Sequence, residues 1–306
     1  MSWIQRINKG ILNYGGDYLK KIIKTLDNIQ FELKEDFNFS WLSKYGNVFC
    51  VFDKQDSGNI CFGVEKEDKK LFIKYAGAPT INYDGNYEDA ILRMKNSILI
   101  YEDIHHQNLI NLIDHFEKSG GYVTIYEWVD GECLHAHWNF DKYPKYTHHS
   151  SPNFKFNQLD LELKLDCIDD IFKLHKLVVK KGYVAIDFYD GSIMYDFKTN
   201  KTTICDIDFY AKSPFINTMG QMWGSSRFMS PEEFELGATI DEITNVFTMG
   251  AIAFELLGNN YNRNIESWTA SEKLFDVAKK ATSKDKYERY QCISDFYSDW
   301  KSNINK

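Results

Sequence analysis

The chain has 306 residues, of which 43% are hydrophobic and 16% aromatic, so it is long and apolar enough to bury a sizeable core. Its formal net charge of −8 argues against nucleic acid as a partner, because phosphate backbones are bound by a surplus of lysine and arginine. The start of the chain is too polar for a signal peptide, and no apolar run approaches the roughly 20 residues needed to cross a bilayer. The six cysteines form no CxxC pair, so we expect free thiols and a cytoplasmic protein without membrane association.

Residues 1–40 are predicted to form a helical N-terminal extension. Apolar residues recur at helical spacing from Ile7 to Leu26, with an interruption at the adjacent glycines 15 and 16. The pattern changes after residue 46, so we expect a separate unit to begin near residue 41.

Residues 41–129 are predicted to form a small α+β lobe. The runs NVFCVFDK, NICFGVEK and LFIKY are rich in β-forming residues and are separated by short polar turns, which predicts an antiparallel meander. A helical period follows over residues 87–104, and two further strand-like runs lie within residues 105–129. The lobe should therefore hold a five-stranded antiparallel sheet and one helix.

Residues 130–306 are predicted to form a larger, mainly helical lobe. A long amphipathic helix, LDLELKLDCIDDIFKLHKLVVKK, should end at Gly182, the residue type favoured just beyond a helix. SIMYDF and TTICDIDF predict a short hairpin, and VFTMGAIAFELLG is apolar on all sides, as expected of a core helix. Residues 135–157 are rich in aromatic side chains and histidine, and no element is assigned to them.

Three carboxylates occupy positions suited to holding a metal ion or a reacting hydroxyl. Asp187 lies five residues after Gly182, between the end of the helix and the start of the hairpin. Asp206 and Asp208 end the second strand of that hairpin and share one side of it by the strand period of two. Because magnesium prefers carboxylate and phosphate oxygens, we expect a magnesium site here. For Asp206, a surface or turn position is equally open.

These motifs resemble those of the protein-kinase-like family, in particular bacterial Ser/Thr protein kinases of the eukaryotic type. LHKLVVKKGYVAID is similar to the run into that family's catalytic loop, and IDFY resembles its DFG element. GSSRFMSPEE resembles the segment that ends in APE, in which Glu232 would pair with Arg289. The resemblance covers residues 47–300 and implies a two-lobed fold, with Asp187 as catalytic base and Asp208 as metal ligand.

The first lobe carries the motifs that imply ATP and magnesium as cofactors. LFIK places Lys74 in the position of the phosphate-binding lysine, and YEWVDGECL resembles the hinge that faces adenine, with Tyr126 as gatekeeper. The implied nucleotide contacts are Gly58, Ile60, Phe72, Lys74, Tyr126, Glu127, Val129 and Ser192. The implied metal ligands are Asp208, Ser192 and Asp206.

The chain departs from the family pattern at several of these positions. The glycine-rich loop falls at residues 53–60 and retains only Gly58, and Phe72 replaces the alanine that underlies adenine. Ser97 replaces the glutamate that should pair with Lys74, for which Glu102 is a candidate substitute. The other replacements are Ala185 and Ile186 for His-Arg, Ser192 for asparagine, Tyr210 for the DFG glycine, and Asn245 for the aspartate of the central helix. Without His-Arg, control by a phosphorylated activation loop is not expected.

Three functions remain open from the sequence. The first is an ATP- and magnesium-dependent phosphotransferase that resembles a Ser/Thr protein kinase and transfers the γ-phosphate to a hydroxyl. The second is a pseudokinase that binds or scaffolds an unidentified partner. The third is a small-molecule kinase of the antibiotic or choline type, suggested by DFYDGS but disfavoured by the SPE element at residues 230–232. The histidines between residues 135 and 149 have no matching cysteine or carboxylate spacing, so zinc is not expected.

Overall fold

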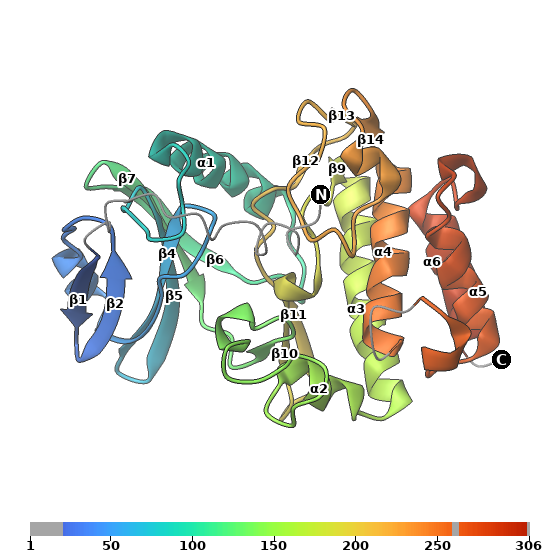
Figure 1. The fold of residues 1–306 in the computed structure, drawn as a ribbon, viewed down its shortest axis with the longest axis horizontal. Coiled ribbons are helices and arrows are strands. Elements are labelled where there is room, and N and C mark those ends of the chain that lie inside the picture. The colour runs from blue at the N-terminus through green and yellow to red at the C-terminus, as the bar shows by residue number, and fades with distance from the viewer. Residues whose placement is uncertain (1–20, 259–262, 305–306) are drawn as a thin grey trace, which may run out of the picture.

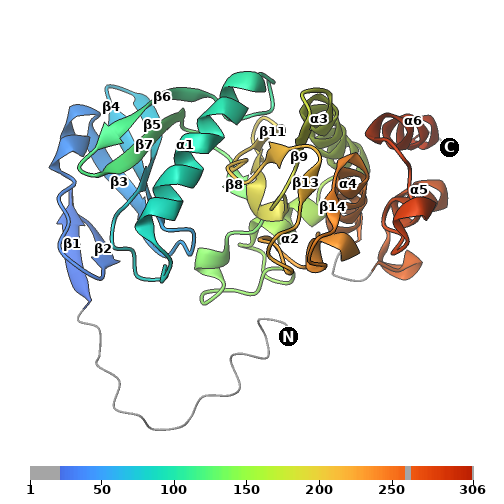
Figure 2. The ribbon, with the colours of Figure 1, turned by 90° about the horizontal axis from the view of Figure 1, so that it is seen from above.

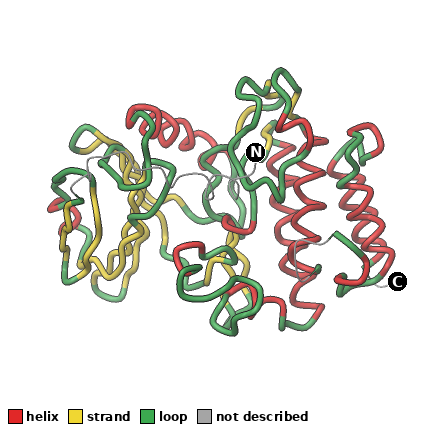
Figure 3. Tube along the Cα trace, in the orientation of Figure 1, coloured by secondary structure: helices red, strands yellow, loops and turns green. Residues whose placement is uncertain are grey.

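The computed structural model describes residues 21–258 and 263–304 and shows a mixed α/β protein, consistent with a two-lobed kinase-like fold (Figure 1). The strands of the main sheet gather at one end of the molecule, and a group of helices lies at the other end (Figure 3). Within the two described ranges, no helix combines the length and the apolar character that a membrane crossing requires.

The main sheet is antiparallel, with the strand order β3-β4-β5-β7-β6. Its strands are β3 (Asn47–Phe52), β4 (Asn59–Lys66), β5 (Lys69–Ala76), β6 (Leu112–Lys118) and β7 (Gly121–Glu127). All five match the predicted strands. The turn between β4 and β5 consists of Glu67 and Asp68, both with positive φ, as in the two-residue turns that suit the twist of a hairpin.

Helix α1 (Tyr87–Asp103) covers one face of this sheet, as Figure 2 shows from above. Its buried Ala90, Met94 and Ile98 pack against Ala76 and Tyr122 of the sheet. The side chain of Asn86 begins the helix by accepting a hydrogen bond from the Glu88 N–H at 3.0 Å.

The predicted helical extension is wrong over its described part. Residues 22–33 form a hairpin of β1 (Ile22–Leu26) and β2 (Ile29–Leu33), followed by a 3-10 turn at Ser40–Lys44. Asp27 and Asn28 make the turn with positive φ values of 46° and 72°, which these two residue types tolerate. Phe31 and Leu33 of β2, with the partly buried Leu26 of β1, pack into the core on the second face of the sheet. The rest of the prediction, residues 1–20, lies outside the described residues.

The helical part is built around α4 (Glu242–Leu257), in which every residue from 244 to 257 is buried, as the sequence predicts. Around it lie α2 (Pro152–Asn157), α3 (Leu161–Lys180), α5 (Glu272–Ala281) and α6 (Ile293–Asn303). Gly182 follows α3 with a φ of +77°, a conformation in which glycine carries no steric penalty.

Short strands connect the helical part to the sheet. β10 (Ile193–Asp196) pairs with β11 (Lys201–Ile204) in the predicted hairpin and also with β8 (Glu132–Cys133). β9 (Tyr183–Val184) pairs with β12 (Ala211–Lys212), and β13 (Phe215–Ile216) pairs with β14 (Thr239–Ile240). The pairs β10–β11 and β9–β12 flank Asp187 and residues 205–208, so they fix the loops that carry the candidate carboxylates.

Candidate functional site

A cavity of about 180 Å³ lies between the sheet and the helical part. Aromatic residues form much of its wall, among them Phe52, Phe72, Tyr126, Trp128 and Trp138. Its polar lining includes Lys74 from β5 and Asp206 from the loop after β11.

Lys74 is held in the cavity by two carboxylates. It lies directly opposite Cys61 of β4, and both line the cavity because paired residues share one face of a sheet. Its Nζ donates to Asp206 Oδ1 at 2.7 Å and to Asp208 Oδ2 at 2.8 Å. Burial opposes the charge on Lys74, but the two carboxylates outweigh burial and raise its pKa well above the usual value. Lys74 therefore stays protonated, and its Nζ is held in place by the two carboxylates.

The two aspartates that hold Lys74 have different environments. Asp208 is buried and accepts a hydrogen bond from the Tyr101 hydroxyl at 3.3 Å. Asp206 has a positive φ of 58°, and its side chain, 53% exposed, lines the cavity. The sequence put Asp208 first as metal ligand, but Asp206 is the one whose oxygens face the cavity. Both carboxylates nevertheless reach the same Lys74 Nζ, as expected of two residues that share one side.

The expected helix partners of Lys74 do not reach it. The Ser97 hydroxyl donates to the Met94 carbonyl at 2.9 Å within α1, and the exposed Glu102 lies 4.0 Å from His115 on the outer side. Tyr101 instead links α1 to this site through its bond to Asp208 and by accepting the Ile207 N–H at 3.3 Å. Sequence reasoning missed Tyr101, because an aromatic residue at helical spacing is typical of core packing.

Asp187 is half-buried on the loop between β9 and β10, with a φ of +61°. Among the described residues, its carboxylate has no hydrogen-bond partner. Burial, followed by the negative charges of Asp206 and Asp56, raises its pKa to about 8. A Cβ added at Gly224 would lie 3.4 Å from Asp187 Oδ1, so the segment around Gly224 passes close beside the carboxylate.

Asn245 of α4 supports the Asp187 loop from below. Its Oδ1 accepts the Ala185 N–H at 2.8 Å, and its Nδ2 donates to the Tyr183 carbonyl at 3.3 Å. Asn245 departs from the family residue, yet the amide satisfies both a donor and an acceptor of the loop backbone.

His175 and Tyr210 form a second support beneath the site. His175 is fully buried on α3, with its Nδ1 2.7 Å from the Ile171 carbonyl and its Nε2 2.8 Å from the Tyr210 hydroxyl. A carbonyl can only accept, so Nδ1 carries the proton and Nε2 accepts from Tyr210. Tyr210, in the place of the DFG glycine, thus ties residues 208–210 to α3.

His175 should make the protein sensitive to acid. Burial lowers the pKa of His175 to about 4 in the folded protein, whereas in the unfolded chain this histidine is protonated below about pH 6.5. The stability that neutral His175 provides is present above pH 6.5 and is lost as pH falls towards 4, a change of about 3 kcal/mol. Urea unfolding from pH 7 to 4 should show a shallower loss for His175→Gln than for wild type or His149→Gln. Equal slopes in all three proteins would contradict the assignment.

Of the remaining predicted nucleotide contacts, some line the cavity and others do not. The predicted nucleotide contact of Ile60 is not supported by its position. Ile60 lies on the opposite face of β4 and packs in the core, whereas its neighbours Asn59 and Cys61 line the cavity. Gly58 does not line the cavity, and a Cβ there would come within 2.7 Å of the Tyr83 ring. The glycine is needed for packing against that ring.

Arg93 of α1 anchors the loop that contains Gly58. Its guanidinium donates to the Ser57 carbonyl and lies 4.7 Å from the centre of the Phe209 ring. Arg93 therefore connects the loop over the cavity to the residue that follows Asp208. The sequence analysis did not single it out.

Phe72, Val129 and Tyr126, three of the predicted nucleotide contacts, line the cavity. The Phe72 ring is 6.1 Å from that of Phe52 and 6.4 Å from that of Tyr126, and a cavity of about 180 Å³ remains beside these rings. The Glu127 carboxylate points away and accepts a hydrogen bond from Asn111 at 3.1 Å.

Ser192 does not reach the cavity. Its hydroxyl is buried and has no hydrogen-bond partner among the described residues, and Gly191 and Met194 form the cavity wall beside it. Its predicted role as a metal ligand is therefore not supported by its position. No three His, Cys, Asp or Glu side chains within the described ranges are grouped to hold a metal ion. Any magnesium here would take most of its ligands from phosphate and water, which is its usual behaviour.

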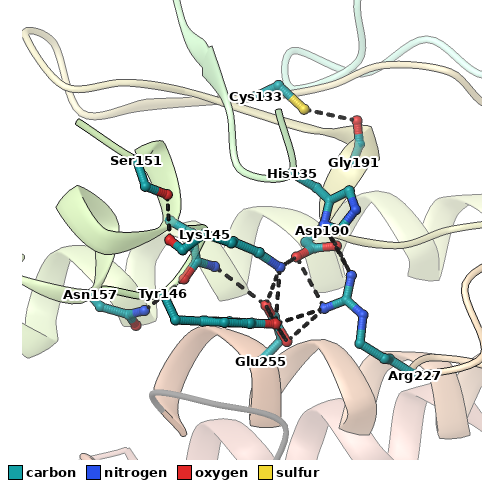
Figure 4. Close-up of polar contacts among 11 residues, drawn as sticks. Cys133, His135, Lys145, Tyr146, Ser151, Asn157, Asp190, Gly191, Arg227 and Glu255 are labelled. Carbon is teal, nitrogen blue, oxygen red and sulfur yellow. Dashed lines mark hydrogen bonds and ion pairs between the residues drawn. The ribbon is translucent and has the colours of Figure 1, made fainter. Parts of the chain in front are cut away.

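A buried ion network lies three residues beyond Asp187 (Figure 4). Asp190 is fully buried and receives Lys145 Nζ and both terminal nitrogens of Arg227, one of them at 2.8 Å. Glu255 of α4 completes the network, with Lys145 at 2.6 Å and Arg227 at 3.0 Å. Burial disfavours the charge on Asp190, but Lys145 and the other cations hold its pKa well below the usual range.

This network joins four segments that are far apart in the sequence. Lys145 comes from residues 135–157, Asp190 from the loop after Asp187, Arg227 from the segment before Ser230, and Glu255 from the central helix. Because both carboxylate oxygens of Asp190 are engaged by these contacts, Asp190 is not available as a metal ligand. The sequence missed the network, because isolated charged residues are usually solvated.

The predicted pair of Glu232 and Arg289 is confirmed. Two parallel hydrogen bonds of 2.7 and 2.9 Å join the guanidinium and the carboxylate, and the Thr244 hydroxyl adds a third at 2.9 Å. Both charged side chains are buried, so the pair fixes residues 230–234 against α4.

Comparisons with known proteins agree with this architecture. The chain is 24% identical to smooth muscle myosin light chain kinase of Gallus gallus over 276 residues, which cover 86% of this chain and 12% of that protein. It is 22% identical to serine/threonine-protein kinase PrkC of Bacillus subtilis (strain 168) over 257 residues, 77% of this chain and 36% of that protein. The chain thus spans about an eighth and about a third of these relatives. No family model matches the sequence. The chain is distantly similar to Ser/Thr protein kinases over most of its length.

Proposed function

We propose that the protein is an ATP- and magnesium-dependent phosphotransferase of the Ser/Thr protein-kinase type. The observation that carries the proposal is the grouping of Lys74 with Asp206 and Asp208, near enough to Asp187 for Asp206 to raise its pKa. Phosphoryl transfer needs a cation on the phosphates, a carboxylate for magnesium and a carboxylate beside the attacking hydroxyl. In this proposal Lys74 supplies the cation, Asp206 the carboxylate for magnesium, and Asp187 the carboxylate beside the hydroxyl.

Each residue has a distinct role in this proposal. Lys74 would orient the phosphates, and Asp206 would hold magnesium while the buried Asp208 keeps Lys74 in place. Magnesium would neutralise negative charge on the phosphate oxygens. Asp187 would orient the substrate hydroxyl and accept its proton. The unpartnered carboxylate of Asp187 is consistent with a group that awaits a substrate.

The hydroxyl acceptor is proposed to belong to a protein. The buried pair of Glu232 and Arg289 fixes the SPE segment, which small-molecule kinases usually lack. A panel of proteins and hydroxylated small molecules, incubated with labelled ATP, distinguishes the two classes. Preferential labelling of the small molecules would favour the antibiotic- or choline-type alternative.

A binding module without catalysis is the second candidate. The cavity of about 180 Å³ is smaller than the roughly 300 Å³ at the lower end of ligand pockets, and Phe72 accounts for part of the restriction. A thermal-shift titration with ATP, with and without magnesium, followed by a transfer assay with Asp187→Ala as control, separates the candidates. No shift and no transfer would favour the binding module.

Replacing Phe72 with alanine should strengthen ATP binding by about tenfold, because the ring narrows the cavity and a smaller side chain opens it. Leu71→Ala is the matched control, since Leu71 precedes Phe72 on β5 and faces the other side of the sheet. Calorimetric titration of both variants checks the prediction. Weaker ATP binding by Phe72→Ala would instead show that a base stacks on the ring.

A further inference from the structure

A second concave surface lies beside the end of the segment that passes Asp187. We call it the basic groove; it has a volume of about 790 Å³ and lies between residues 226–234 and the end of α5. Four cations line it, Arg263, Lys279, Lys280 and Lys284, against two carboxylates, Asp276 and Glu288. The groove thus has a local excess of positive charge on a chain whose net charge is −8.

The cations of the groove are available to a ligand. Lys279 and Lys284 are exposed, and no carboxylate of the described residues forms an ion pair with either of them or with Arg263. Arg263 is held at the wall, because its guanidinium donates to the Arg227 carbonyl at 2.6 Å and lies 5.1 Å from the centre of the Phe247 ring. Closely grouped cations that no carboxylate neutralises favour an anionic ligand.

The groove also offers apolar contacts. Met229, Pro231 and Phe234 contribute to its lining, and the Phe234 side chain is 43% exposed. An exposed aromatic ring beside grouped cations fits a ligand that carries an apolar side chain next to carboxylates. Nucleic acid fits less well, because a strand longer than the groove would extend onto a chain whose net charge is −8.

The groove continues from the proposed catalytic site. Gly224 passes Asp187, and Ser226, two residues later, already lines the groove. An extended protein segment with its hydroxyl at Asp187 could therefore follow residues 224–234 into the groove.

We infer that the basic groove docks an acidic segment of the protein substrate, one that carries carboxylates and an apolar side chain near the hydroxyl that is phosphorylated. The inference rests on the proposed phosphotransferase function for its link to Asp187. The docking itself requires only the cations and Phe234, so it can be measured without nucleotide.

Fluorescence anisotropy tests the docking with a labelled peptide that contains one serine, one phenylalanine and several glutamates. The double variant Lys279→Glu and Lys284→Glu should bind this peptide at least about tenfold more weakly than wild type, and Phe234→Ala should also weaken binding. Lys66→Glu with Lys69→Glu is the matched control, because both lysines are exposed on the distant β4–β5 hairpin and make the same charge change. The control should bind the peptide as wild type does.

Several results would overturn the inference. Equal binding by the groove and control variants would show that the groove does not hold the peptide. Equal or tighter binding of a peptide with lysines in place of the glutamates, or of a single-stranded RNA probe, would show that the ligand class is wrong. Self-association abolished by the groove variants alone would identify a second copy of the chain as the occupant.

The failure of docking is distinguishable from the failure of the proposed function. Peptide binding that depends on the lysines, without ATP binding or phosphate transfer, would retain the groove and exclude the phosphotransferase. Phosphate transfer that shows no preference for acidic substrates, and is unchanged in the groove variants, would retain the enzyme and exclude the groove.

Discussion

Replacing Asp187 with asparagine should reduce phosphate transfer by about three orders of magnitude, within the range that a positioned general base contributes. Asparagine keeps the shape of the side chain and tolerates the positive φ of this position, so the loop should retain its conformation. ATP affinity should change little, because Asp187 serves the hydroxyl rather than the phosphates. Steady-state kinetics should therefore show a loss in kcat with an almost unchanged KM for ATP. Asp68→Asn, an exposed residue with a similar φ, is the control and should leave both constants unchanged.

The pH dependence of phosphate transfer is a second test of Asp187 as the general base. A base must be deprotonated to act, and burial together with Asp206 and Asp56 raises its pKa to about 8. The value of kcat/KM, which reports groups of the free protein, should therefore rise with pH and level off above about 8. Bound magnesium should move this rise to lower pH, because its positive charge counters the charge of Asp206. Asp56→Asn removes one repelling charge and should also move the rise to lower pH. A pH-independent rate, or transfer by Asp187→Asn at the wild-type rate, would exclude Asp187 as the base.

Replacing Lys145 with methionine should destabilise the fold by about 3–5 kcal/mol, because it removes the cation that contacts both Asp190 and Glu255 and leaves these two carboxylates buried with less positive charge beside them. Methionine retains most of the side-chain volume, so the loss reports the charge rather than a cavity. Denaturant unfolding at neutral pH measures the change.

Lys155→Met is the matched control for Lys145→Met. Lys155 pairs with Glu132 at 2.9 Å, but both side chains are about 40% exposed, so the expected loss is about 0–1 kcal/mol. Equal losses in the two variants would show that burial does not distinguish these ion pairs. A loss below about 1 kcal/mol for Lys145→Met would show that the network does not hold the four segments together.

The sequence predicted the elements whose pattern is local. The five strands of the sheet, α1, α3, α4 and the hairpin of β10 and β11 follow from periodicity, turn residues and the glycine after α3. The β1–β2 hairpin was mistaken for a helix, because Ile22, Ile23 and Leu26 suit either period over so short a run. The decisive signal was the Asp27–Asn28 pair, which forms the turn.

The motifs identified residues that lie together in the structure, but not which of them line the cavity. Lys74, Asp206 and Asp208 meet at one point, and of the two aspartates only Asp206 lines the cavity. A register difference of one residue on β4 placed Cys61 in the cavity and Ile60 in the core, since neighbouring side chains face opposite sides.

The buried network could not be predicted from a single sequence. Lys145 and Glu255 are separated by 110 positions. Glu255 lies inside the predicted core helix, but no pattern around Lys145 indicates burial or identifies it as the partner of Glu255. Only the packing of residues 135–157 against α4 brings them together, and this segment has no periodicity from which its path could be inferred.

The magnesium dependence of ATP binding is the most direct test of the proposed site. Calorimetric titration of ATP should show binding that magnesium strengthens by at least about tenfold in wild type and in Asp68→Asn, because Asp206 presents its carboxylate to the cavity. Asp206→Asn should lose most of that strengthening. The absence of ATP binding at millimolar concentrations, with and without magnesium, would contradict the proposed phosphotransferase.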